Sequence, residues 1–146
     1  MELFTFRASG PYIARELNIE SKVLLYLFDA VFSSDPANYV SNMFLVAAVY
    51  NRFPLPLVST LSEIDLIPED KVDEIHNWSQ SSQALEKAIE QQLEGYARVL
   101  SNRILNVISD LDLMTCLISV SAKTGDGIIN LDAVLQRVLR SGEETY

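Results

Sequence analysis

The chain has 146 residues, of which 49% are hydrophobic and 21% charged, and its formal net charge is −9. This length is typical of one domain, and the apolar content excludes an intrinsically disordered chain. The longest apolar run, 43–50, is far shorter than the roughly 20 residues of a membrane-spanning helix. The Lys and Arg residues number 11 and do not cluster, which argues against nucleic-acid binding, because such binding depends on neutralising phosphates.

The single cysteine, Cys116, lies in an apolar strand-like run and has no disulfide partner within the chain. Residues 1–4 lack the positively charged start and apolar stretch of a signal peptide. These two features predict a reducing, cytoplasmic location. Many of the acidic residues fall between 63 and 74, and we interpret most of them as a solvated helix face.

Ser9-Gly10-Pro11 predicts a turn near the start of the chain. Residues 22–29 then form a nearly continuous apolar run, which is typical of a parallel strand covered on both faces. Similar runs at 55–61 and 113–120 are separated from their neighbours by helical patterns. Such β-α-β repeats predict an α/β fold, a single domain over 1–146 with about three parallel strands flanked by helices.

The expected helices have recognisable starts. Asp35 predicts a cap, and Pro36 the first position of a helix that continues to about residue 53. The second half of that helix has little polar surface, so it is either sandwiched in the core or in contact with another subunit. Residues 68–78 predict a shorter acidic helix, and Asn130 predicts the cap of a last one.

Residues 83–110 carry one apolar stripe at steps of three and four, which predicts a long helix that Gly95 kinks or breaks. Packing against the chain's own sheet and contact with a second subunit explain this stripe equally well. The stripe consists of Leu85, Ile89, Leu93, Tyr96, Leu100, Ile104, Val107 and Leu111.

Two polar segments follow predicted strands, at the edge of an α/β sheet where ligands bind. They are Leu-Ser-Glu-Ile-Asp-Leu at 61–66 and Val-Ser-Ala-Lys-Thr-Gly at 120–125. Guanine carries N1–H and N2–H donors beside its O6 acceptor, so a guanine pocket needs a carboxylate and an N–H group. Asp65 and the backbone of Ala122 can supply them. Ser121 would brace Asp65 by a hydrogen bond, and the aliphatic stem of Lys123 could lie on the base.

The order of these segments resembles the C-terminal half of a GPN-loop GTPase, in the wider class of P-loop GTPases. Residues 61–66 stand in the place of the family's base-recognition motif (Asn/Thr/Ser)-Lys-x-Asp-Leu, and 120–123 in that of its final Ser-Ala-Lys loop. Residues 1–4 are similar to the segment directly after the family's Asp-x-Pro-Gly-Gln motif, and parts of 27–41 resemble its next strand and helix. The resemblance covers nearly the whole chain.

This resemblance implies a partial P-loop NTPase-like fold with a guanine subsite. An intact member of the family would bind GTP and hydrolyse it to GDP and phosphate with Mg²⁺, and the family is homodimeric. The residues that would bind guanine in this chain are Ser62, Asp65, Ser121, Ala122 and Lys123.

No phosphate-binding loop of the form GxxxxGK(S/T) occurs in the 146 residues. We therefore expect the N-terminal strands and this loop to be missing, Mg²⁺ to bind only through the missing half, and this chain alone not to hydrolyse GTP. The strand at 23–28 would have an open edge, where that half would pair with it. A truncated gene model and a split-gene product both fit this expectation.

Glu63 stands where the family usually has Lys, and a carboxylate near a polyanion should weaken GTP binding. This departure leaves two other functions open. The chain could be a non-catalytic protein-interaction module derived from a GTPase fold, or a domain of another nucleotide-dependent family in which adenine competes with guanine. We interpret His76 as a surface helix position and Asp29 as a weaker candidate for a nucleotide contact.

Overall fold

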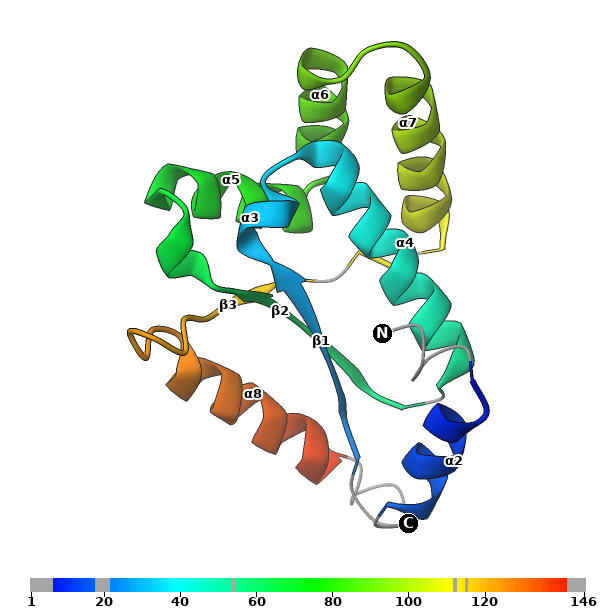
Figure 1. Ribbon diagram of the computed structural model, residues 1–146, viewed down its shortest axis with the longest axis vertical. Helices are drawn as coiled ribbons and strands as arrows, with labels where there is room; N and C mark the ends of the chain where they lie inside the picture. The colour runs from blue at the N-terminus through cyan, green and yellow to red at the C-terminus, as the bar shows by residue number, and fades with distance from the viewer. Residues whose placement is uncertain (1–6, 18–21, 54, 112, 115, 142–146) are drawn as a thin grey trace.

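The computed structural model describes residues 7–17, 22–53, 55–111, 113–114 and 116–141. Its sheet has three parallel strands in the order β1-β2-β3 (Figure 1). The strands are β1 Leu24–Asp29, β2 Leu57–Ser62 and β3 Ile118–Ser119. The expected α/β fold with a partial parallel sheet is therefore confirmed.

Strand β1 is at the edge of this sheet. Among the described residues it pairs with β2 alone, from Leu24 opposite Leu57 to Asp29 opposite Ser62. Tyr26 and Phe28 are buried, whereas Leu25 and Leu27, on the other face, are 38% and 55% exposed. The edge that was expected to be open is thus unpaired in the described part of the chain.

Strand β3 is shorter than the apolar run 113–120 predicts. Only Ile118 and Ser119 are strand residues, and they pair with Thr60 and Leu61 of β2. Residue 115 of the predicted strand lies outside the described residues. Leu113 and Met114 pack against the core without pairing, and Cys116 is exposed, so this apolar run reflects contact with the core rather than strand pairing.

The helix α4, Pro36–Arg52, begins as the sequence predicts. A carboxylate oxygen of Asp35 accepts hydrogen bonds from the backbone N–H groups of Ala37 and Asn38 at 2.9 and 3.0 Å. A short helix that the sequence did not predict, α3 Ala30–Ser33, precedes it. The turn predicted at residues 9–11 is instead the start of α2, Ser9–Glu16, because the first turn of a helix tolerates proline.

The single long helix predicted over 83–110 is two helices. They are α6, Ser82–Gln92, and α7, Gly95–Asp110, and Gly95 has a φ of 56° at the break. The break changes which residues face the core: Ser101, Leu105 and Ile108 are the buried residues of α7. The helix predicted over 68–78 is α5, Glu69–Gln80.

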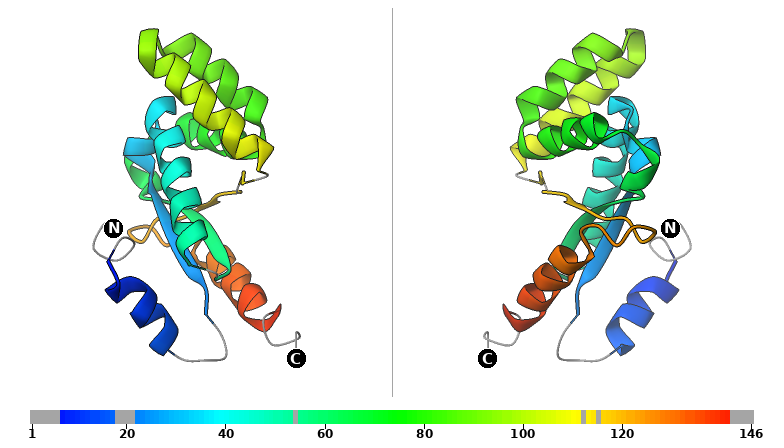
Figure 2. Two further views of the ribbon diagram at one scale, coloured as in Figure 1. Left: turned by 90° about the vertical axis from the view of Figure 1, so that its right-hand side faces the viewer. Right: turned by 90° about the vertical axis from the view of Figure 1, so that its left-hand side faces the viewer.

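The core lies between one face of the sheet and helices α4 to α7. An aromatic ladder crosses it from Tyr26 through Phe28 and Tyr39 to Trp78, with ring centroids 5.1, 5.7 and 5.6 Å apart. Helices α6 and α7 stand side by side at the end of the molecule away from α2 and α8 (Figure 2). None of the helices in the described ranges is long and apolar enough to cross a membrane.

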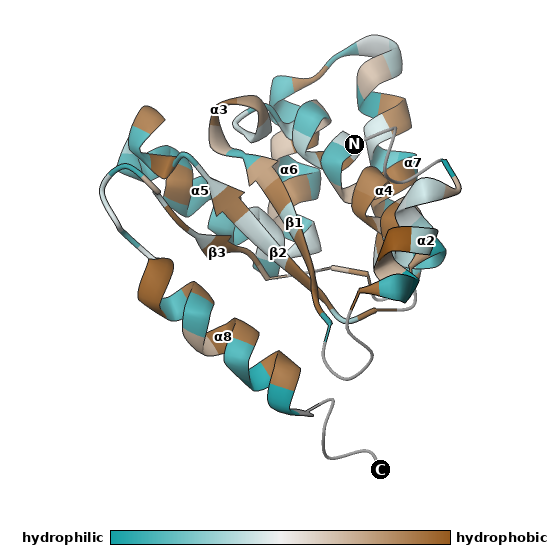
Figure 3. Cartoon of the chain, turned by 60° about the horizontal axis from the view of Figure 1, so that its bottom comes forward, coloured by the Kyte–Doolittle hydropathy of each residue, from teal (hydrophilic) through white to brown (hydrophobic). Residues whose placement is uncertain are grey.

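Helix α8, Ile128–Ser141, lies on the side of the sheet opposite α4 (Figure 1). It begins before Asn130, so the prediction that Asn130 caps it is wrong. Apolar and polar residues alternate along it (Figure 3), and its apolar stripe is only half-buried. That stripe consists of Leu131, Val134, Leu135, Val138 and Leu139. Both this helix and the outer face of β1 thus leave apolar side chains partly uncovered.

Candidate functional site

The two polar segments meet at the carboxyl ends of β2 and β3. The backbone N–H of Val120 donates to the carbonyl of Leu61 at 2.8 Å, which extends the pairing of these strands by one residue. Past the strand end, the N–H of Ile64 donates to the carbonyl of Val120 at 3.4 Å. The first segment then forms the short 3-10 helix η1, Ile64–Leu66. Two parts of the chain far apart in sequence are therefore held together at one edge of the sheet.

Ser121 and Asp65 form the central contact of this site. The Ser121 hydroxyl, which is fully buried, donates to Asp65 Oδ1 at 2.6 Å and accepts from the backbone N–H of Thr124 at 3.2 Å. The side chain of Asp65 is 15% exposed, although its backbone faces solvent. Ser121 thus fixes the orientation of a shielded carboxylate whose second oxygen is not used by this bond.

Lys123 lies on the outer side of Asp65. Its Nζ is 3.7 Å from Asp65 Oδ2, and its side chain is 78% exposed. Because Lys123 is exposed and the separation is long, this pair contributes little stability, so the lysine side chain is free to move onto a ligand.

The pKa of Asp65 is lowered from its ordinary value. The hydrogen bond from Ser121 is the largest cause of the lowered pKa, burial opposes it as the next largest effect, and a backbone hydrogen bond and Lys123 lower the pKa further. The carboxylate is therefore ionised at neutral pH. Since the folded pKa is the lower one, its contribution to stability is present above about pH 4 and is lost as pH falls through the folded value.

Replacing Ser121 with Ala should raise the pKa of Asp65 toward the ordinary value of about 4, because the hydrogen bond that favours the charged form is lost. A ¹³C NMR titration of the Asp65 carboxyl group measures this shift. Ser62→Ala is the matched control and should leave it unchanged, because the Ser62 hydroxyl donates to the Phe28 carbonyl at 3.1 Å instead. If Asp65 titrates at the same pH in wild type and in Ser121→Ala, the hydrogen bond from Ser121 is not the main cause of the lowered pKa.

Ala122 is exposed at the tip of the bend, and its backbone N–H makes no hydrogen bond within the described ranges. The bend is closed behind it: the N–H of Ser121 donates to the Asp126 carbonyl at 3.0 Å, and that of Gly125 to the Ser121 carbonyl at 2.9 Å. The Thr124 hydroxyl also donates to Asp126 Oδ2 at 2.6 Å. The unbonded N–H of Ala122 therefore belongs to a loop with several internal bonds.

Sequence reasoning missed Asp126 and Gly127. Gly127 has a φ of 73°, and a Cβ there would lie 1.8 Å from the Ser119 carbonyl oxygen. Only glycine fits such a close approach of two backbone segments. A Gly-Asp-Gly sequence directly before a helix was the available signal for this turn.

The remaining candidates differ in their environment. Ser62 lies at the end of β2, where its hydroxyl braces β1 through Phe28 and does not contact Asp65. Glu63 is exposed and has a φ of 61°, a left-handed conformation that is uncommon for residues other than glycine. Asp29 accepts a hydrogen bond from the N–H of Phe32 at 2.8 Å and so caps α3. His76 is half-buried rather than a plain surface residue, with its Nε2 2.6 Å from Ser119 Oγ.

The arrangement fits the edge of a purine: a shielded carboxylate and an exposed residue whose N–H is unbonded within the described ranges lie on neighbouring loops. It offers no comparable metal site, because no group of three or more His, Cys, Asp or Glu side chains comes together within the described ranges.

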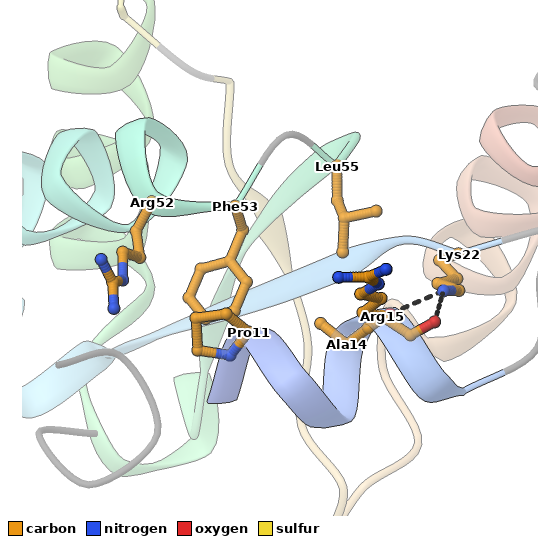
Figure 4. A pocket seen from close by; sticks show the side chains of 7 residues that line it. All are labelled: Pro11, Ala14, Arg15, Lys22, Arg52, Phe53 and Leu55. Carbon is orange, nitrogen blue, oxygen red and sulfur yellow. Dashed lines mark hydrogen bonds between the residues drawn. The ribbon is translucent and has the colours of Figure 1, made fainter. Parts of the chain in front are cut away.

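A separate cavity of about 320 Å³ lies beside the amino ends of β1 and β2 (Figure 4), whereas the two loops follow the carboxyl ends of β2 and β3. Phe53 and Leu55 line it together with Arg15, Lys22 and Arg52. Lys22 Nζ donates to the carbonyls of Ala14 and Arg15 at 2.6 and 3.2 Å, and the two arginines lie in the last turns of α2 and α4. These cations complement the negative ends of two helices, so this cavity is not a stronger candidate.

Comparison with known proteins identifies related sequences. A family model described as "conserved hypothetical ATP binding protein" matches residues 1–141. The chain is 26% identical over 147 residues to GPN-loop GTPase QQT2 of Arabidopsis thaliana, which covers 100% of this chain and 38% of that protein. It is 28% identical over 130 residues to GPN-loop GTPase 1 of Dictyostelium discoideum, covering 88% and 32%. The chain therefore spans well under half the length of these curated relatives.

The fold also matches a solved structure, that of a GTPase from Pyrococcus abyssi in its apo form. The TM-score is 0.77, the sequence identity is 17%, and the match covers 94% of this chain and 54% of the other. The two chains thus share a fold.

Proposed function

Because this chain belongs to the GPN-loop GTPase family, we propose that it supplies the base-recognition part of a GTP- and GDP-binding site. The observation that carries this proposal is the shielded carboxylate of Asp65, which is held by Ser121, the residue directly before the exposed Ala122. In this proposal residues 1–146 are one domain that corresponds to the C-terminal half of such a GTPase.

The chemistry of recognition follows from the groups on each side. Asp65 accepts hydrogen bonds from guanine N1–H and N2–H, and the N–H of Ala122 donates to O6. The stem of Lys123 covers the ring, and Ser62 supports the segment that carries Asp65. Adenine lacks the matching donors, so it would leave buried polar groups unpaired at a cost of roughly 1–3 kcal/mol each.

The phosphates and Mg²⁺ would be held by residues outside this sequence, since it contains no GxxxxGK(S/T) loop. GTP hydrolysis depends on those groups, so it belongs to an assembly that includes them. The edge of β1, which has no partner strand among the described residues, and the exposed side chains of Leu25 and Leu27 support pairing at that edge with a segment that carries the phosphate loop. Adding such a segment should tighten GTP binding at least about tenfold.

The proposed guanine site is tested by changing Glu63 to Lys. This change replaces a negative charge by a positive one beside the expected nucleotide, so GDP should bind about tenfold tighter. The affinity is measured by competition of unlabelled GTP and ATP against a fluorescent GDP. Glu90→Lys on α6 makes the same charge change away from the site and is the matched control, with little expected effect.

The outcomes separate the functions that the sequence left open. GTP competing far better than ATP supports the guanine site. Equal competition by ATP would contradict guanine specificity and favour an adenine-binding relative. If neither wild type nor Glu63→Lys binds nucleotide, the guanine proposal fails and a protein-interaction module is favoured.

A second candidate function, protein interaction, is favoured by one surface. On α7 the residues Tyr96, Leu100 and Val107 are 79%, 42% and 54% exposed, although they belong to the predicted apolar stripe. Helix α4, which packs against α7, exposes Phe44 and Tyr50 as well. We propose that this α4–α7 surface binds a second copy of the chain to form a homodimer.

Leu100→Glu should therefore convert a dimer into a monomer, because it places a charge in an apolar contact. Analytical ultracentrifugation measures the dissociation constant. Asn106→Glu, at another exposed position of α7, is the matched control and should leave the dimer largely intact. A wild-type chain that is monomeric at high concentration would contradict the dimer proposal.

A further inference from the structure

Strand β3 is too short to fix by itself the position of the bend that follows it. It has two strand residues, Ile118 and Ser119, and in the described part of the chain it pairs with β2 alone. The bend with Ser121 and Ala122 starts two residues after the end of the strand, beyond Val120. Its position therefore depends on contacts made outside the strand ladder.

Ser119 is where those contacts come together. Its backbone is opposite Leu61 in the register of the sheet. Its carbonyl oxygen lies against the backbone of Gly127, so closely that a Cβ at 127 would be 1.8 Å away. Its hydroxyl is 2.6 Å from Nε2 of His76. The side-chain contact is thus one of three that hold the residue, and it is the one that comes from a helix.

His76 is well placed to hold Ser119 firmly. It lies on α5 between Ile75 and Trp78, which are 0% and 2% exposed, so the helix is fixed in the core on both sides of it. Helix α5 is also the first long element after the segment that contains Asp65. The two sides of the site are therefore connected twice, by Ser121–Asp65 at the edge and by His76–Ser119 behind it.

We propose that His76 is a positioning residue for base recognition, which holds the Ser121–Ala122 bend at the correct distance from Asp65 through its hydrogen bond to Ser119. The expected effect on nucleotide affinity rests on the proposed function. The expected effect on the position of the bend does not. Without this hydrogen bond, Ser119 keeps only its backbone contacts, and the bend is held to the Asp65 segment only by the bonds of Val120 and Ser121. We expect the bend to become more mobile relative to Asp65.

Three variants test the contact. His76→Leu and Ser119→Ala remove it from opposite sides, and His76→Gln restores it, because the glutamine amide reaches about as far as Nε2 and bonds a hydroxyl in either direction. Asn77→Leu, at the exposed neighbouring position on α5, is the matched control. Trp78 is the sole tryptophan and reports by fluorescence that each variant is folded.

The first measurement is amide hydrogen exchange at Ser121, Thr124 and Gly125, whose N–H groups are all bonded within the bend. In His76→Leu and Ser119→Ala these amides should exchange roughly three- to tenfold faster, the equivalent of one hydrogen bond, while β1 amides stay unchanged. His76→Gln should be within about twofold of wild type. The double variant should be no worse than either single one, because both remove the same bond.

The second measurement is GDP affinity, which should fall by the same roughly three- to tenfold in His76→Leu and recover in His76→Gln. Wild-type exchange rates in both His76→Leu and Ser119→Ala, or additive effects in the double variant, would overturn the inference. Altered exchange in a chain that does not bind GDP at all would instead reject the proposed function and leave the contact's structural role in place.

Discussion

Asp65→Asn is expected to reverse base preference, lowering GDP affinity by about two orders of magnitude and raising that for xanthosine diphosphate. The carboxylate accepts two N–H groups of guanine, and each charge-assisted bond of this kind is worth about 1.5–3 kcal/mol. Asparagine offers an amide N–H₂ instead, which matches xanthine because xanthine has an oxygen where guanine has its 2-amino group. Competition titrations with the two diphosphates measure the change.

The fold should survive this substitution, because the amide oxygen of asparagine can still accept the hydrogen bond from Ser121. Asp70→Asn removes an exposed carboxylate from the first turn of α5 and serves as the matched control. Unchanged GDP affinity in a folded Asp65→Asn chain would mean that this carboxylate does not touch the base.

Gly127→Ala is expected to cost at least about 3 kcal/mol of stability, the range seen when a substitution forces backbone atoms apart. The new Cβ would lie 1.8 Å from the Ser119 carbonyl oxygen and 2.9 Å from its carbonyl carbon, and neither atom belongs to a side chain that can turn away. Strand β3 and the loop must therefore separate. Urea unfolding followed by Trp78 fluorescence measures the loss of stability.

Gly125→Ala is the matched control, because Gly125 has a φ of 84° but no atom lies within 4 Å of its added Cβ. It should lose only the cost of a left-handed conformation, about 1–2 kcal/mol. The difference between the two variants isolates the close approach at Ser119. Equal losses of stability in the two variants would mean that the left-handed backbone conformation alone explains the need for glycine at both positions.

Much of the fold could be predicted because its signals are local. Asp35-Pro36 specifies a helix start through the chemistry of two adjacent residues, and the structure has that cap. The apolar runs at 22–29 and 55–61 predict two parallel strands, which are β1 and β2. The expectation that the first is covered on both faces is wrong for the described residues, because Leu25 and Leu27 are exposed. The rule that ligands bind at strand carboxyl ends was enough to bring Asp65 and Ser121 to one place.

Other features depend on tertiary contacts that leave no periodic signal. Leu113, Met114 and Leu117 are used for packing against the core, so the sequence overestimates β3. Gly95 indicated where the long helix breaks. It did not indicate which face of α7 would turn toward the core, where Leu105 is buried and Tyr96 is exposed. The contact between His76 and Ser119 joins side chains 43 residues apart, and nothing in the spacing of either residue indicates the other.

Guanine recognition by Asp65 and Ala122 is tested most directly by a ¹H–¹⁵N NMR titration of the chain with guanosine monophosphate, which probes the base contacts without needing a phosphate loop. We predict a downfield shift of the Ala122 amide as it bonds to guanine O6, a smaller response to inosine monophosphate and none to adenosine monophosphate. Equal responses to all three nucleotides, or shifts that leave Ala122 and Asp65 unaffected, would contradict guanine recognition by these two residues.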